Sequence, residues 1–291
     1  MSTWQELVTP PTADAASFPD CAITGLAHLG LIRIGGADMR TFLQGQVTND
    51  VNQVTPELAQ LSSYCSPKGR MLGSLWIFQR GDDLFLQLPE AVKPAILKRL
   101  QMFVLRSDVQ LEDVGDRLAR FGLCGDCASS LLPFAPADEK ATQSRDDITV
   151  IRMPGAMPRF EVIGPPDQLA PLWSDGRRSA HQVNPDLWAL ADIRAGVPHV
   201  FEETVEAFVP QMANLQLVGG VSFTKGCYTG QEVVARMQYL GKLKRRMYRA
   251  HVDTDDRPAP GTELFSHSSE SGQGAGRIVD AAPAPEGGYE V

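Results

Sequence analysis

The feature that organises this chain is the stretch Lys225-Gly226-Cys227-Tyr228-Thr229-Gly230-Gln231-Glu232, followed by the apolar run 233–237. Thr229 and Glu232 fit a Ser/Thr-x-x-Glu capping box, so we expect a helix with Thr229 as its N-cap. Cys227 would then lie just before the positive end of the helix dipole and near Lys225, and both favour the reactive thiolate. The pattern therefore predicts a chemically reactive cysteine. The alternative is a small residue in a tight, glycine-rich turn.

Two further motifs lie upstream. They are Phe42-Leu43-Gln44-Gly45-Gln46-Val47-Thr48-Asn49-Asp50-Val51 and Phe208-Val209-Pro210-Gln211-Met212-Ala213-Asn214-Leu215. Together with 225–232, in which all eight residues agree, they resemble the YgfZ family of folate-binding, GcvT-related proteins, and they occur in the family's order. The resemblance runs from about residue 26 to the end of the chain. It implies an α+β fold, with a GcvT-like body of several lobes, ferredoxin-like sheets and a C-terminal β-barrel.

The resemblance and the composition together predict four parts of the chain. Residues 1–20, rich in Pro, Ala, Thr and acidic side chains, would form a flexible arm. Residues 21–115 and 185–239 would form a discontinuous folate-binding α+β body, and residues 116–184 a second, smaller α+β lobe. Residues 240–291 show short β segments punctuated by Gly and Pro, as in a barrel. The family pattern continues for a few more strands, so we expect an incomplete barrel, either truncated or reduced.

The resemblance also implies a function. It is that of a tetrahydrofolate-binding accessory protein for iron–sulfur cluster assembly or repair and for tRNA modification, rather than a classical enzyme. Its partners would be folate and iron–sulfur enzymes or their assembly proteins, with tRNA an indirect partner. Cys227 would be the catalytic group, assisted by Lys225. The expected folate contacts are Trp188, Asn49 and Asp50, together with Tyr228, Gln231, Glu232 and Arg236 in and after the motif.

The predicted folate contacts outside the motif also have ordinary structural alternatives. Trp188 matches a folate-contacting position of the family, and its aromatic plane suits a pterin ring, but it could equally belong to the core. Asn49 and Asp50 could hold the pterin's amino edge, or simply serve as turn and capping residues. The family's second folate-contacting tryptophan falls near Leu29 here, which removes one stacking partner.

The stretch after the Lys68-Gly69 turn bears on the reaction. Aminomethyltransferases of the glycine cleavage system resemble this chain but place paired aspartates where Gly73 and Ser74 stand here. Neither residue transfers a proton near pH 7 as a carboxylate does, which argues against aminomethyl transfer. Two alternatives to the accessory role follow. One is a folate-dependent one-carbon transferase with a different acid or base, and the other is an RNA-binding factor that uses the cationic residues 242–249.

Composition and charge are those of an ordinary globular chain, with one local exception. The 291 residues are 43% hydrophobic and 21% charged, with a net charge of −8, so no overall attraction to nucleic acid or anionic membrane is expected. Residues 225–249 hold seven cations and one anion, a net of +6, and the rest carries −14. Such a strip would bind phosphates or a polyglutamate tail; a solvated strand of alternating charge is the alternative.

The five cysteines stand at 21, 65, 124, 127 and 227 and form no secretory disulfide pattern. Cys124 and Cys127 make a lone CxxC with no second pair and no matching histidine spacing, so no metal site is predicted. The N-terminal residues lack a signal-peptide pattern, and no apolar run approaches the ~18 residues of a membrane span. We therefore expect a cytoplasmic, monomeric protein with reduced thiols and no membrane contact.

Overall fold

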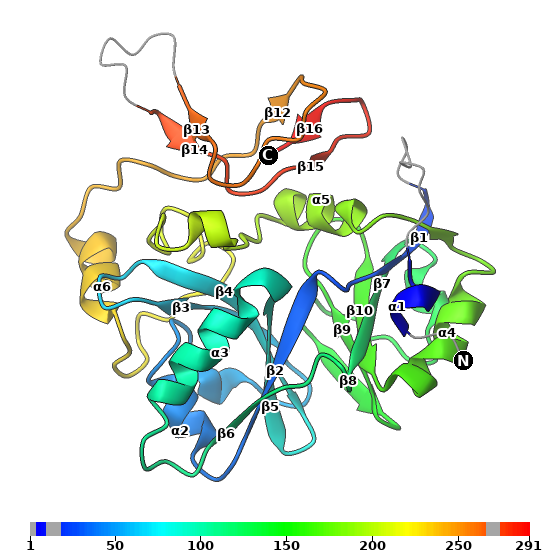
Figure 1. The fold of residues 1–291 in the computed structure, drawn as a ribbon, viewed down its shortest axis with the longest axis horizontal. Helices are drawn as coiled ribbons and strands as arrows, with labels where there is room; N and C mark the ends of the chain where they lie inside the picture. The colour runs from blue at the N-terminus through cyan, green and yellow to red at the C-terminus, as the bar shows by residue number, and fades with distance from the viewer. Residues whose placement is uncertain (1–3, 10–18, 266–273) are drawn as a thin grey trace.

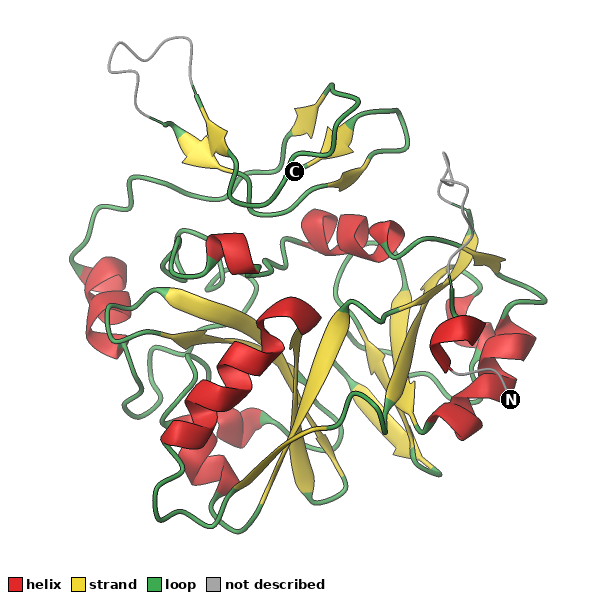
Figure 2. Cartoon of the chain, viewed as in Figure 1, coloured by secondary structure: helices red, strands yellow, loops and turns green. Residues whose placement is uncertain are grey.

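The computed structural model describes residues 4–9, 19–265 and 274–291. Two β-sheets stand side by side, helices cover their outer faces, and the C-terminal segment lies across one end of both sheets (Figures 1 and 2). The chain is therefore an α+β protein, as its sequence predicts. Helix α5 (Asp186–Ala195) lies between the sheets and the C-terminal segment, and α6 (Gln231–Tyr239) follows the Cys227 loop.

The first lobe is an antiparallel sheet of five strands in the order β3-β4-β5-β2-β6. Helices α2 (Met39–Gln44) and α3 (Lys93–Met102) pack on one face, burying Phe42, Leu43 and Ile96. The remaining elements are β2 (Leu29–Gly35), η1 (Val51–Gln53), β3 (Gln60–Cys65), β4 (Met71–Arg80), β5 (Asp83–Pro89), η2 (Glu90–Val92) and β6 (Gln110–Asp113).

The second lobe is a sheet of six strands in the order β11-β1-β7-β10-β9-β8, antiparallel except for the β1–β11 pair. Helix α4 (Pro166–Gly176) covers its outer face and buries Leu169 and Trp173. The other elements of this region are β1 (Cys21–Gly25), β7 (Ala119–Gly125), η3 (Ala128–Leu131), β8 (Thr142–Arg145), β9 (Ile148–Arg152), β10 (Arg159–Gly164) and β11 (His181–Gln182), and η4 (Glu202–Thr204) follows α5.

Strand β1 joins the second sheet, although the predicted folate-binding body, residues 21–115 and 185–239, included residues 21–25. Of the predicted arm, residues 1–3 and 10–18 lie outside the described residues. Within it, α1 (Trp4–Leu7) packs on the second lobe, where the ring of Trp4 contacts those of Phe121 and Trp173 at centroid distances of 6.3 and 6.0 Å. Residues 4–8 thus contribute to the outer core.

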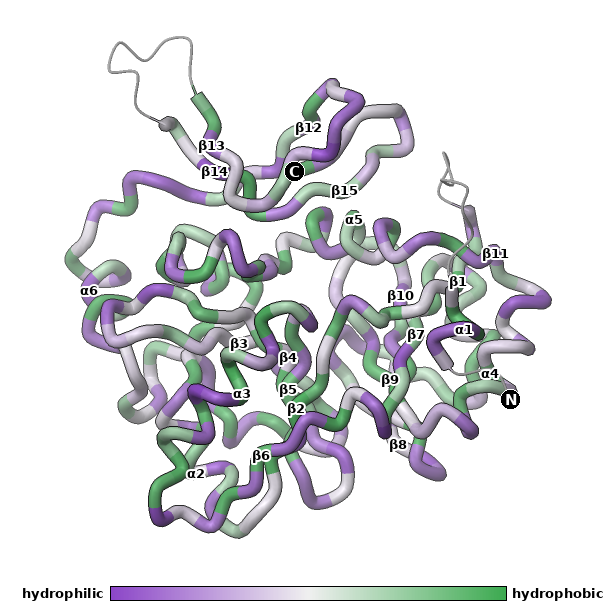
Figure 3. Tube along the Cα trace, viewed as in Figure 1, coloured by the Kyte–Doolittle hydropathy of each residue, from purple (hydrophilic) through white to green (hydrophobic). Residues whose placement is uncertain are grey.

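Strands β2 to β5 of the first sheet are buried on both faces because they separate two cores, whereas the edge strand β6 is mostly exposed. In β4, Trp76 and Phe78 point into the core between the sheets, whereas Leu75 and Ile77 point towards α2 and α3. This alternation places one side chain in each core in turn. It explains why β4 and β5 consist mostly of apolar residues. In Figure 3 the sheets are of mixed colour, with hydrophobic stretches interrupted by hydrophilic ones.

The predicted C-terminal barrel is not found among residues 240–265 and 274–291. Five two-residue strands form a three-stranded sheet, β12-β16-β15, and a two-stranded sheet, β13-β14. Strands this short, separated by Gly and Pro, supply too few ladder hydrogen bonds to close a sheet on itself. The bounds are β12 (His251–Val252), β13 (Glu263–Leu264), β14 (Gly276–Arg277), β15 (Ala282–Pro283) and β16 (Tyr289–Glu290).

The prediction of reduced thiols is wrong for two cysteines, because Cys21 and Cys127 form a disulfide. Cys21 pairs with Gly125 in the β1–β7 ladder, which brings it close to Cys127 across 106 residues of sequence. The CxxC pattern indicated the wrong neighbour, since Cys124 is a buried free thiol.

Within the described parts of the chain, no helix has the length and apolar character needed to cross a membrane. The same residues bring together no group of three or more His, Cys, Asp or Glu side chains that could hold a metal ion.

Candidate functional site

The Cys227 loop ends one residue later than predicted, and Thr229 is not the N-cap. Helix α6 begins at Gln231, and Gly230 precedes it in a left-handed conformation with φ 84°. A Cβ on Gly230 would lie 2.5 Å from the Ser66 carbonyl oxygen, so only glycine fits here. The Tyr228 amide donates to Gln231 Oε1 across 3.1 Å, which closes the loop in place of a Thr229–Glu232 capping box. Glu232 instead pairs with Arg236, 2.6 Å away on the exposed side of α6.

Lys225 fixes this loop to the first lobe. Its Nζ donates to the carbonyl oxygens of Gln44, Val47 and Asn49, at 2.6, 2.6 and 3.0 Å. Burial lowers the pKa of Lys225 to about 8, and the Asp50 carboxylate acts in the opposite direction. The three carbonyl contacts are made by the protonated ammonium, and they indicate a positioning role. The catalytic role of Lys225 stays a prediction.

Cys227 is exposed, whereas its neighbour Tyr228 is buried under the loop with its ring centroid 5.0 Å from Lys225 Nζ. Burial raises the pKa of the Tyr228 phenol, which is therefore held neutral. The loop is anchored by its buried residues and presents its thiol outward.

The predicted folate contacts Asn49 and Asp50 are engaged in local hydrogen bonds. Asn49 Nδ2 donates to the carbonyl oxygens of Leu61 and Gly219, at 2.9 and 2.7 Å. Asp50 Oδ1 accepts from Gln44 Nε2, and also from the Asn52 amide as the N-cap of η1. These are the turn and capping roles that the sequence left open, and folate contact at either residue stays a prediction.

Trp188 lies in α5 at the core between the sheets and is 1% exposed. A Cβ on Gly122 would lie 2.4 Å from its ring, so the β7 backbone touches the indole directly. The Arg159 guanidinium lies 5.0 Å from the ring centroid and forms an ion pair of 2.6 Å with Asp192. The folate contact predicted for Trp188 stays a prediction.

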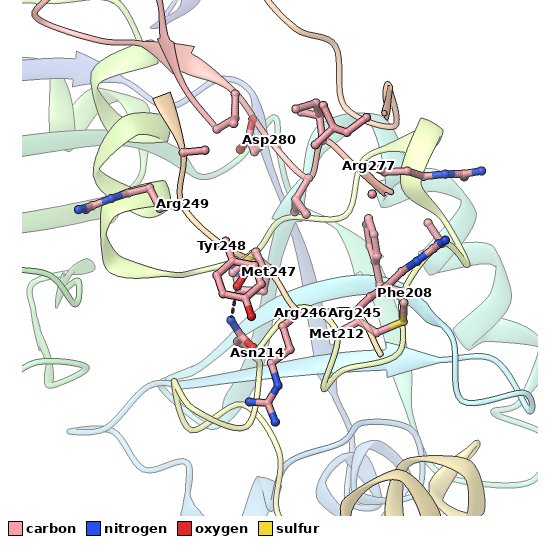
Figure 4. A pocket seen from close by; sticks show the side chains of 18 of the residues that line it. Phe208, Met212, Asn214, Arg245, Arg246, Met247, Tyr248, Arg249, Arg277 and Asp280 are labelled. Carbon is pink, nitrogen blue, oxygen red and sulfur yellow. Dashed lines mark hydrogen bonds between the residues drawn. The ribbon is translucent and has the colours of Figure 1, made fainter. Parts of the chain in front are cut away.

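A large cleft lies between α5, the turn at Lys68 and the C-terminal segment, with a volume of about 1530 Å³. Figure 4 shows arginines 245, 246, 249 and 277 around it, together with Phe208, Met212 and Tyr248. Three acidic side chains line it, Glu206, Glu263 and Asp280, against eight cations. The cations are Lys68, Arg70, Arg194, Lys244, Arg245, Arg246, Arg249 and Arg277.

A smaller chamber of about 570 Å³ lies between the two lobes. Leu61 and Trp76 form its wall on the first sheet, and residues 154–156 and 217–219 line it elsewhere. Ala195 and Val197 line both cavities, so the chamber and the cleft both adjoin the end of α5. Cys227 lines neither of them.

Gly73 and Ser74, which stand where aminomethyltransferases have paired aspartates, lie in β4. A Cβ on Gly73 would point towards Ile96 of α3, at 3.5 Å. Ser74 is buried, and its hydroxyl has no hydrogen-bond partner among the described residues. No acid or base stands at these two positions.

The chain matches no protein-family model. It is 33% identical over 243 residues to the tRNA-modifying protein YgfZ of Colwellia psychrerythraea, covering 80% of this chain and 72% of that protein. Against the tRNA-modifying protein YgfZ of Escherichia coli strain UMN026 it is 31% identical over 281 residues, covering 95% and 85%. The chain belongs to the YgfZ family.

The fold of this YgfZ family member is also that of an aminomethyltransferase. The glycine cleavage system aminomethyltransferase T from Bartonella henselae superposes with a TM-score of 0.75 over 98% of this chain and 86% of that one. At 15% identity this likeness shows the fold alone. The GcvT-like body inferred from the motifs is thereby confirmed.

Sequence reasoning missed the apolar residues that line the cavities. In the sequence, Trp76 is indistinguishable from other apolar residues of a buried strand, and Phe208 is recognised only as part of a motif. The cationic strip was the usable signal, because Lys244, Arg245, Arg246 and Arg249 all line the cleft.

Proposed function

We propose that this chain is a tetrahydrofolate-binding accessory protein that supports iron–sulfur cluster assembly or repair and tRNA modification, with Cys227 as its reactive group. It would work as a monomer in the cytoplasm, with iron–sulfur enzymes or their assembly proteins as partners and tRNA as an indirect one. Membership of the YgfZ family, whose relatives are named tRNA-modifying proteins, supports the proposed role in tRNA modification. The two cavities that adjoin the end of α5 support the choice of ligand.

A folate has two chemically different ends. Its ring system is planar and nearly neutral, whereas its glutamate tail carries carboxylates. The chamber is lined by apolar residues such as Leu61, Trp76 and Val197, with Glu139 and Lys140 as its charged residues. The neighbouring cleft has eight cations against three acids. A pocket with apolar walls and a few convergent charged groups is typical of such an amphipathic ligand.

Not every cation of the cleft is available to a ligand. Arg277 pairs with Glu263 at 3.0 Å, and Glu290 contacts both Arg194 and Arg249. Lys68, Lys244 and Arg246 make no ion pair with any described residue. We assign the carboxylates of the tail to these three.

The position of Cys227 supports the proposal that its thiol reacts with a molecule other than the bound folate. Its side chain is exposed and lies outside both cavities, on a loop that Lys225 and Tyr228 hold from beneath. A thiol presented in this way suits reaction with a group brought by another macromolecule.

Titration calorimetry with 5-formyltetrahydrofolate, carrying one or several glutamates, tests the proposal. We expect the doubly substituted Lys244→Ala, Arg246→Ala variant to bind the polyglutamate form at least tenfold more weakly, with a smaller salt dependence. Arg178→Ala, a change at an exposed residue after α4, is the matched control and should bind like the wild type. Absence of folate binding by the wild type would refute the ligand assignment.

The exposed segment 242–249 also favours direct RNA binding as a second candidate. Lys242, Lys244, Arg245, Arg246 and Arg249 are all exposed there, and Tyr248 is exposed among them. Micromolar binding of tRNA with a steep salt slope would support it, and no binding at low salt would exclude it. Turnover of a one-carbon folate would instead support the transferase alternative, for which Gly73 and Ser74 supply no acid or base.

A further inference from the structure

The connection after α3 carries three exposed apolar side chains within four residues. Met102, Phe103 and Leu105 are 58%, 42% and 86% exposed, whereas Val104 turns inward and packs against the core of the first lobe. A single exposed apolar side chain needs no explanation, but several gathered at one place mark an interaction site. We call residues 102–105 the apolar tip.

The backbone presents Leu105 outward in an unfavourable conformation. Its φ is 48°, in the left-handed region that a bulky side chain rarely adopts, and the other non-glycine residues with positive φ in the described chain are all polar. The loop is fixed just beyond it, because the amides of Asp38 and Asp108 donate to Asp108 O and Asp38 Oδ2 at 3.0 and 2.8 Å. Such a conformation persists only where the surroundings enforce it, and binding sites are where it is common. An exposed leucine held in this way points to a role in binding.

Helix α2 connects the apolar tip with the Cys227 loop. Asp38, which contacts Asp108, directly precedes α2, and Gly45 directly follows it. The Gly45 carbonyl oxygen accepts a hydrogen bond of 3.4 Å from the amide of Thr229, two residues after Cys227. At 1.5 Å per residue, a helix of six residues is roughly 9 Å long. One bound protein, which covers about 800 Å² of its partner, can therefore reach both the tip and the thiol.

The charges beside the apolar tip are positive. Lys98, Arg99 and Arg106 flank it, and residues 98–107 include no acidic side chain. Lys98 and Arg106 are exposed and form no ion pair with any described residue, while Arg99 lies 5.9 Å from the ring centroid of Phe103. Aromatic residues, Met and Arg are enriched at protein–protein interfaces, and cations favour an acidic partner surface. Leucine and methionine offer no flat face on which a base could stack, which argues against RNA.

We propose that the apolar tip is the docking site for an acidic protein, the partner that approaches Cys227. Phe103 and Leu105 would enter an apolar pocket of that protein, and Lys98 and Arg106 would face acidic side chains at its rim. This inference rests on the proposed function. Docking here leaves folate access free, since no residue of the tip lines the cleft or the chamber.

Photo-crosslinking in cells tests the contact directly. The full chain carries p-benzoylphenylalanine in place of Leu105, or in place of Leu58, an apolar residue elsewhere that is also exposed. We expect the first protein alone to crosslink to an acidic iron–sulfur enzyme or assembly protein, identified by mass spectrometry. Lys98→Glu with Arg106→Glu should weaken this crosslink at least about fivefold. Equal crosslinking from both positions, or crosslinking of position 105 to RNA or lipid only, would overturn the proposal.

Complementation tests whether the contact matters. Phe103→Ser with Leu105→Gly removes both side chains, and glycine suits φ 48°, so the loop keeps its conformation. Expressed from one chromosomal copy, this variant should restore tRNA methylthiolation at least about fivefold less than the wild type. It should bind 5-formyltetrahydrofolate and unfold in urea as the wild type does. Leu105→Met, which keeps an apolar side chain, and the control Leu58→Ser should complement fully.

The outcomes separate this inference from the proposed function. Full restoration by the Phe103→Ser, Leu105→Gly variant, while Cys227→Ala restores nothing, would refute the docking site and leave the proposed function standing. Loss of folate binding or of stability in that variant would show that the tip is structural and would also refute the docking site. Full restoration by Cys227→Ala would refute the proposed function itself.

Discussion

The carbonyl oxygen of Val47 accepts a hydrogen bond of 2.6 Å from Lys225 Nζ, across 178 residues of sequence. Two of the three motifs that resemble the YgfZ family are thus joined by one side chain. The same ammonium contacts the carbonyl oxygens of Gln44 and Asn49, so the connection after α2 and the Cys227 loop form one unit.

Replacing Lys225 with methionine should therefore loosen this unit. The change removes three hydrogen bonds from a charged donor and leaves three carbonyl oxygens to find new partners, for a loss of about 2 to 3 kcal/mol. Urea unfolding at pH 7 measures this loss. Lys242→Met, at an exposed lysine with no ion pair among the described residues, is the control and should unfold like the wild type. Equal stability of both variants would show that Lys225 does not anchor the loop.

Alanine substitution at the two glycines of the loop should change the stability of the chain by different amounts. Gly230→Ala forces a Cβ to within 2.5 Å of the Ser66 carbonyl oxygen at φ 84°, and we expect a loss of about 2 kcal/mol or more. Around Gly226 no heavy atom lies within 4 Å of an added Cβ, so Gly226→Ala should stay within about 1 kcal/mol of the wild type. Thermal unfolding of the pair measures the difference, and similar melting temperatures would contradict the described packing.

The sequence predicted the helix after Cys227 but not how that helix begins. The Thr229–Glu232 pattern is a local signal, whereas the start of α6 depends on Gly69 and Ser66, which lie far away in sequence and require glycine at 230. The Cys21–Cys127 bond also depends on a long-range strand pairing. Local motifs were enough to predict the α+β class and the GcvT-like body. Local charge was enough to predict the cationic strip. A cavity between the lobes was implied by the resemblance, but its lining could not be predicted, since Leu61 and Trp76 become a cavity wall only when two sheets meet.

The buried ion pair at α5 should be a major contributor to stability. Asp192 Oδ1 lies 2.6 Å from Arg159 Nη2, and its other oxygen lies 3.0 Å from His199 Nε2. Asp192→Ala leaves the buried guanidinium uncompensated and should cost roughly 3 to 5 kcal/mol. Asp175→Ala removes an exposed pair with Arg178 and should cost under about 1 kcal/mol. Urea unfolding of the two variants tests this, and a small loss for Asp192→Ala would disprove a central role for the pair.

Glu161 should give the stability a pH dependence of its own. Burial raises its pKa from 4.5 to about 7, although Arg120 and the Gln87 hydrogen bond act in the opposite direction. The folded chain thus holds a proton that the unfolded chain releases, and stability falls as the pH rises from 4.5 to 7. The full effect is on the order of 3 kcal/mol, at 1.36 kcal/mol for each pKa unit.

Glu161→Gln removes this titration while keeping an oxygen that accepts from Gln87. The charged groups that act on Glu161, namely Arg120, Arg159 and Asp192, are present in both proteins, so the difference between the two stabilities isolates Glu161. Measured by urea unfolding from pH 5 to 8, the stability of the wild type relative to the variant should decline up to about pH 7 and then level off. Parallel curves would mean that Glu161 does not carry the shifted proton.

The central claim is that Cys227 is the reactive group of a folate-dependent accessory protein. Its most direct test is complementation of a strain that lacks its own YgfZ protein, with iron–sulfur enzyme activity and tRNA methylthiolation as readouts. We predict that the wild type and the exposed control Thr224→Ala restore both, and that folded Cys227→Ala restores neither. Equal restoration by Cys227→Ala would contradict the claim and leave Cys227 as a turn residue.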